Sequence, residues 1–168
     1  IKFRDAAKGF KMAKDAELIF YNLDAIKGET TCIITEGEID CLTLYECGIY
    51  NSVSVPNGAS KGSQKLEYLD NCWNYFETMD KIVLAVDNDE AGISLQNELA
   101  RRLGKEKCFT VAYPEGCKDL NDVLVNHGKT WVVQIIEAAR EMPMEGIVTL
   151  DEMFPVITDW FENGYPKG

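Results

Sequence analysis

The sequence contains one histidine, His127, and six cysteines that form no CxxC pair. Zinc sites need several such ligands at short spacings, and disulfide frameworks need paired cysteines in an oxidising compartment. Several of the cysteines stand inside apolar runs, as small buried hydrophobic residues do. The sequence therefore indicates a reducing, cytoplasmic setting and argues against both a zinc site and a disulfide framework.

Long apolar runs are also absent. No stretch reaches the roughly 18 residues that span a bilayer, and no basic segment followed by an apolar one marks secretion. The chain has no P-loop, so Lys118 is not a Walker lysine. These absences predict a protein without a membrane anchor and without a nucleotide site of the P-loop kind.

Positive charge is scarce, with 17 Lys and Arg residues against 28 Asp and Glu residues, which gives a formal net charge of −11. A strongly acidic surface repels nucleic acid. We therefore expect any contact of this chain with nucleic acid to be local or mediated by a metal ion.

Apolar β-branched runs alternate with helical patterns along the 168 residues. Strands are predicted at 31–35, 52–56, 81–86 and 108–114, and helices at 38–48, 63–78, 89–104, 120–128 and 130–142. An extended stretch is expected at 17–26. The alternation predicts an α/β fold with about four strands in a mostly parallel sheet and helices on both faces.

Two of the predicted strands end abruptly in acid, within the stretches CIITEGEID (32–40) and IVLAVDND (82–89). Glu36 follows the first strand, Asp87 and Asp89 follow the third, and Asp119 lies after the fourth. The carboxyl ends of parallel strands share one edge of a sheet, which is where ligands bind. An acid at a helix start also has an ordinary explanation, since it caps the helix and complements its dipole.

Acids at three strand ends favour a shared site over three separate caps. Clustered carboxylates repel one another, and a divalent cation relieves that repulsion. Asp87 and Asp89 flank one residue, a spacing that suits a hard cation. If the first and third strands are neighbours, their acidic ends form two walls of one cation pocket.

Other acidic motifs fit less well. The stretch 87–98 has acids and a glycine at several positions of a calcium-binding loop, but Ala91 fills the fifth position and a strand precedes it. Ala91 also stands where phosphatases of the haloacid dehalogenase type have Thr. Phosphoacceptor receivers place adjacent acids after the first strand, where this chain has Glu36-Gly37-Glu38.

The motifs TEGEIDCLTLYECG, SVPNGAS, VLAVDNDEAG and GCKDLNDVL together resemble the Toprim domain. In particular, they are similar to the primase half of the bifunctional primase–helicases of T-odd bacteriophages and their relatives, including the mitochondrial replicative helicase. The segments YNLDAIKGE and FPVITDWFENGYPKG resemble the same group. The resemblance covers nearly the whole chain and implies the Toprim fold.

The resemblance also implies roles for the acids. Glu36 would be the catalytic residue, as a general base for a 3′-hydroxyl or as a metal ligand. Asp87 and Asp89 would bind Mg²⁺ or Mn²⁺, and Asp40 and Asp119 match further acidic positions linked to the metal.

Four other residues have implied roles. Lys118 and Lys61 would contact nucleotide phosphate, although a solvated loop lysine is an equal alternative for Lys118. Gly37 and Gly92 would let the backbone approach the site.

The function that the resemblance implies is metal-dependent, template-directed synthesis of RNA primers for DNA replication, in a phage or mobile-element setting. The implied partners are a single-stranded DNA template, ribonucleoside triphosphates and a C-terminal RecA-like helicase domain. A metal-dependent Toprim nuclease and a non-catalytic scaffold of a replicative helicase are the alternatives. No membrane is involved under any of these interpretations.

The same resemblance divides the chain into three parts. Residues 1–30 would be the remnant of an N-terminal primase subdomain, 31–142 the Toprim catalytic domain, and 143–168 a linker toward a helicase domain. We expect the piece represented by these residues to have little or no activity by itself.

Overall fold

The computed structural model describes residues 2–4, 10–59, 66–143 and 150–164. A five-stranded sheet lies at its centre, in the order β4-β3-β5-β6-β7. Its strands are β3 (Thr31–Thr35), β4 (Ser52–Ser54), β5 (Lys81–Ala85), β6 (Cys108–Thr110) and β7 (Arg140–Glu141). The four predicted strands are present and parallel, and β7 adds an antiparallel edge beside β6.

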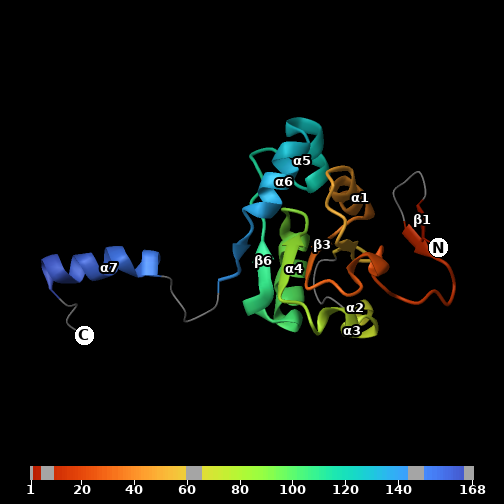
Figure 1. Cartoon of the computed structure of the whole chain (residues 1–168), viewed down its shortest axis with the longest axis horizontal. Helices are drawn as coiled ribbons and strands as arrows, with labels where there is room; N and C mark the ends of the chain where they lie inside the picture. The colour runs from red at the N-terminus through yellow and green to blue at the C-terminus, as the bar shows by residue number, and fades with distance from the viewer. Residues whose placement is uncertain (1, 5–9, 60–65, 144–149, 165–168) are drawn as a thin grey trace.

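The helices cover both faces of the sheet, as predicted (Figure 1). They are α1 (Glu38–Glu46), α2 (Glu67–Asn71), α3 (Trp73–Phe76), α4 (Glu90–Leu103), α5 (Leu120–His127) and α6 (Lys129–Glu137). Helices α2, α3 and α4 share one apolar core with the sheet, and α1, α5 and α6 share another. The α/β architecture with a mostly parallel sheet is therefore confirmed.

Each central strand contributes side chains to both cores, because successive side chains of a strand point to opposite faces of the sheet. Ile34 and Leu84 belong to the core under α4, while Ile33 and Val83 belong to the core under α1 and α5. Every one of these four side chains is buried. A central parallel strand needs apolar residues on both faces, which explains the nearly continuous apolar runs in the sequence.

Several expected elements differ from the structure, and the strand expected at 108–114 already ends at Thr110. The helix expected at 130–142 ends at Glu137, because the chain turns back and Met142 N donates to Cys108 O (3.0 Å) at the edge of β6. The helix expected at 63–78 is two short helices interrupted at Cys72, and residues 60–65 lie outside the described part. The stretch expected to be extended at 17–26 makes one bridge, Tyr21 to Ser54, and then forms a 3₁₀ helix over Leu23–Ile26.

The two ends of the described chain lie outside the sheet. Strands β1 (Lys2–Arg4) and β2 (Phe10–Met12) form a small antiparallel pair, and helix α7 (Leu150–Asn163) stands away from the sheet on the opposite side (Figure 1). Among the described residues, no helix is both long enough and apolar enough to cross a membrane.

Candidate functional site: an acidic pocket at the strand ends

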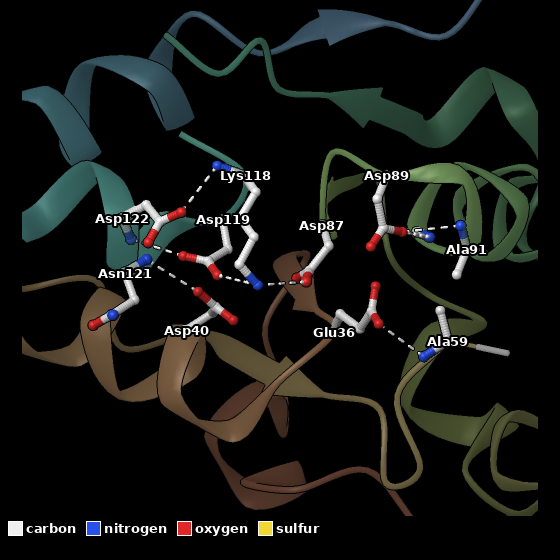
Figure 2. A network of polar contacts seen from close by, with 11 residues as sticks. Glu36, Asp40, Ala59, Asp87, Asp89, Ala91, Lys118, Asp119, Asn121 and Asp122 are labelled. Carbon is white, nitrogen blue, oxygen red and sulfur yellow. Dashed lines mark hydrogen bonds and ion pairs between the residues drawn. The ribbon is translucent and has the colours of Figure 1, made fainter. Parts of the chain in front are cut away.

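A pocket of about 450 Å³ opens at the carboxyl end of the sheet. Its lining residues are Glu36, Gly37, Glu38, Ile39, Asp40, Asn57, Gly58, Asp87, Lys118, Asp119, Asn121 and Asp122. Strands β3 and β5 are neighbours, and Thr35 pairs with Ala85 at the end of their shared ladder. That register brings Glu36 and Asp87, which follow these strands, to adjacent positions at the pocket (Figure 2).

Glu36 is half-buried between the two strand ends. Its Oε1 accepts a hydrogen bond from Ala59 N (3.0 Å), and its buried Oε2 has no partner among the described residues. Burial raises the pKa of Glu36, the Ala59 bond opposes that effect, and the charges of Asp87 and Asp89 add to the rise. The side chain is therefore a better proton acceptor than a solvated glutamate.

Asp87 faces Asp119 across the pocket with Lys118 between them (Figure 2). Lys118 Nζ lies 3.5 Å from Asp87 Oδ2 and 3.1 Å from Asp119 Oδ2. Burial raises the pKa of Asp87, and the ammonium of Lys118 partly offsets this. The hydrogen bond to Asp119 and the charge of Asp87 raise the pKa of Lys118, so this lysine is charged.

Asp89 has a structural task as well as a place near the site. As the N-cap of α4, its Oδ1 accepts hydrogen bonds from Ala91 N and Gly92 N, both at 2.9 Å. Figure 2 shows its other oxygen directed towards Glu36. The capping explanation thus holds for one oxygen and leaves the second oxygen for a ligand.

The two glycines lie where the chain passes close to site residues. A Cβ at Gly92 would lie 2.0 Å from the carbonyl oxygen of Asp87, so only glycine lets α4 begin this close to the strand end. A Cβ at Gly37 would lie 3.1 Å from Asp40 Oδ2.

Asp40 is buried one helical turn after Glu36. Its Oδ1 accepts from Asn121 N (3.1 Å), which joins α1 to the start of α5. Burial and the nearby charge of Asp119 raise the pKa of Asp40 to about 7. Asp119 is also the N-cap of α5 and accepts from Asp122 N (2.7 Å).

The sequence did not reveal every participant. The loop after β4 supplies Ala59 N to Glu36; the quoted motif SVPNGAS includes this loop but did not reveal the bond. The hydroxyls of Tyr68 and Tyr113 are buried without a partner among the described residues, and burial followed by nearby carboxylates raises both pKa values. Nothing in the sequence marked these tyrosines. Lys61 lies outside the described residues.

The donor chemistry of the pocket suits a hard divalent cation, since its side chains offer carboxylate and amide oxygens. In the present arrangement, however, the described carboxylates are not grouped closely enough to coordinate one ion. Within the described ranges, no three acidic, histidine or cysteine side chains form a group that could hold a metal ion. The types of donor atom suit a metal ion, but the ammonium of Lys118 lies between the carboxylates of Asp87 and Asp119.

A parallel sheet with acids after two adjacent central strands defines the class of Toprim-like domains. The Toprim-like family model matches residues 33–124, and the chain belongs to this family. The chain is also similar to two plant proteins. It is 36% identical to the Twinkle homolog protein, chloroplastic/mitochondrial, of Arabidopsis thaliana over 96% of this chain and 25% of that protein. It is 37% identical to the Primase homolog protein of the same plant, over 86% of this chain and 48% of the relative.

Among solved structures, the primase fragment of the bacteriophage T7 primase–helicase protein aligns with a TM-score of 0.68 and 30% identity. The alignment covers 80% of this chain and 56% of that one. The expected resemblance to the Toprim domain of primase–helicases is thereby confirmed. The chain spans less than half the length of the curated relatives named here.

Proposed function

We propose that this chain is the catalytic Toprim domain of a DNA primase and that it synthesises RNA primers on a single-stranded DNA template. The observation that carries the proposal is that Glu36 and Asp87, which follow two adjacent strands, line the same acidic pocket of a Toprim-like domain. The names of the relatives support it, since one is a primase homolog and another a primase–helicase.

The reaction would be attack by a ribose 3′-hydroxyl on the α-phosphorus of a ribonucleoside triphosphate. A P–O bond forms to the new nucleotide, the bond to the β-phosphate oxygen breaks, and pyrophosphate leaves. Glu36 would accept the hydroxyl proton, and its pKa, which burial raises, supports that role. Asp87, Asp89, Asp40 and Asp119 would hold Mg²⁺ or Mn²⁺, which when bound neutralises the phosphate charge.

We also propose domain limits and two phosphate contacts from the similarity to primases. Residues 31–142 would be the catalytic domain, 1–30 part of a preceding primase subdomain, and 143–168 a connection to a RecA-like helicase domain. Lys118 and Lys61 would contact the triphosphate.

The test is primer synthesis by the full-length protein that carries this chain, on single-stranded template with ribonucleoside triphosphates and Mg²⁺. Glu36→Gln should lower the rate by about a hundredfold or more, the scale of losing a general base. Asp87→Ala should also lower the rate strongly, because it removes a proposed metal ligand. Glu46→Gln is the matched control, because Glu46 is an exposed acid of α1 paired with Lys129 away from the pocket. Normal priming by Glu36→Gln would contradict the proposal, and so would cleavage of DNA in place of primer synthesis.

A further inference from the structure

Lys118 is held at the pocket by contacts of two kinds. Its backbone is fixed, since Asn88 N donates to Lys118 O (2.7 Å) and Lys118 N donates to Asp122 Oδ2 (3.2 Å). Its side chain is 62% exposed and bridges Asp87 and Asp119 through the ammonium. The loop can therefore stay in place while the side chain moves.

The pocket has many more acidic than basic residues among its described lining residues, and the basic one is Lys118. Among the described residues that line the pocket, six are acidic and Lys118 alone is basic. Its ammonium touches two of the acids, which are 19% and 14% exposed and would otherwise repel each other. Among the described lining residues, positive charge reaches these two carboxylates from Lys118.

An ammonium in that position also competes with a metal ion. It takes up oxygens of Asp87 and Asp119, and it repels a divalent cation placed close to it. This arrangement agrees with the finding that no three acidic side chains of the described chain form a group that could hold an ion. The lysine side chain is itself mostly exposed and carries a single charge, so a doubly charged ion, which the carboxylates attract more strongly, can displace the ammonium from its two partners.

We propose that Lys118 is an internal counter-ion: its ammonium holds Asp87 and Asp119 while the pocket is free of metal, and it leaves both when a divalent cation binds. The inference rests on the proposed function, in which the same carboxylates bind the metal. The backbone bonds to Asn88 and Asp122 keep the released ammonium at the rim of the pocket.

The test is a Mn²⁺ titration of this chain, followed by the loss of the free-ion signal in electron paramagnetic resonance, for the wild type and three variants. Lys118→Met removes the charge and keeps the length of the side chain, and we expect it to bind Mn²⁺ about tenfold more tightly at low ionic strength. Lys118→Arg keeps the charge and should not bind more tightly than the wild type. Lys129→Met removes an exposed lysine paired with Glu46 outside the pocket and should leave the affinity unchanged.

A second readout separates this role from a loss of folding. Without metal, Lys118→Met should have a lower thermal midpoint than the wild type, because the carboxylates lose their counter-ion. Saturating Mn²⁺ should then raise its midpoint by more than it raises that of the wild type. A Lys118→Met variant that is folded by circular dichroism and binds Mn²⁺ no more tightly than the wild type overturns the inference.

That outcome is distinct from failure of the proposed function. If the wild type and Lys118→Met both bind no Mn²⁺, the metal site itself is wrong and the counter-ion role falls with it. If the wild type binds Mn²⁺ and the variant binds it equally well, the metal site stands and only the role of Lys118 is overturned.

Discussion

Asp40 shows at the scale of one residue how the fold concentrates acid at the pocket. It is 6% exposed, and burial together with the charge of Asp119 raises its pKa to about 7. An unfolded aspartate has a pKa of about 3.9, so the folded state binds the proton more tightly. Its contribution to stability is therefore complete below about pH 4 and is lost as the pH rises through about 7.

We expect the metal-free chain to be more stable at pH 5 than at pH 8, with Asp40 contributing on the order of 3 kcal/mol to the difference. Asp40→Asn keeps the oxygen that accepts from Asn121 N and removes the titration. Urea unfolding at both pH values, with a chelator present, should show a clearly smaller difference for the variant. Some dependence should remain, because the pKa values of Glu36 and Asp87 are also raised. An unchanged pH dependence in Asp40→Asn would contradict this role.

The sequence predicted those pocket residues that directly follow a recognisable strand. Glu36 and Asp87 could be found because an apolar run stops beside each. The division of Asp89 between a helix cap and the site could not be found, since it depends on the rotation of one carboxylate. The bond from Ala59 to Glu36 was hidden as well, because it depends on how the loop after β4 passes over the end of β3.

At the scale of an element, helix α4 begins in direct contact with the end of β5. Asp89 caps its first turn, and Gly92 in that turn lies against the Asp87 carbonyl. Alanine is ordinarily the better helix residue by about 1 kcal/mol. At position 92 its methyl group would lie 2.0 Å from a backbone oxygen, so the clash decides the outcome.

Gly92→Ala should therefore destabilise the chain by about 2 kcal/mol or more, since a backbone contact cannot relax as a side chain can. Asn97→Ala, at an exposed position of the same helix, is the matched control and should be neutral or slightly stabilising. Denaturant midpoints of the two variants give the comparison. A Gly92→Ala variant as stable as Asn97→Ala would show that α4 can shift away from β5 at little cost.

Other elements show which features the sequence could predict. The four parallel strands and the helices on both faces followed from apolar periodicity, which buried residues such as Ile34 and Leu84 impose. Strand β7 was mistaken for the end of a helix because the stretch around Arg140 and Glu141 has no strand pattern. Its conformation comes from pairing with β6, which no local signal reports.

At the scale of the whole molecule, the described chain divides into a sheet with its helices and a separate α7 (Figure 1). The aromatic residues Phe154 and Phe161 of α7 are 66% and 88% exposed. The two apolar cores contain residues of the sheet and of helices α1–α6, and none of the α7 residues whose side chains the structure describes. The stability of the sheet and its packed helices should therefore not depend on α7.

A chain that ends at Pro143 should accordingly keep its thermal midpoint within about 2 °C of the 168-residue chain, a change equal to less than 1 kcal/mol. Matched scanning calorimetry of the two chains measures this. A chain that ends at Glu137 is the informative comparison, because it removes β7 and should be clearly less stable. A large loss on removing only residues 144–168 would contradict the domain boundary proposed at 142.

The central claim is that the acidic pocket binds a divalent cation through the carboxylates that follow β3 and β5. The most direct measurement is anomalous diffraction from crystals of this chain grown with Mn²⁺. We expect an anomalous peak within direct coordination distance of Asp87 and Glu36 or Asp119, with the ammonium of Lys118 displaced from its two partners. Occupied Mn²⁺ sites elsewhere, and none at the pocket at saturating Mn²⁺, would contradict the account.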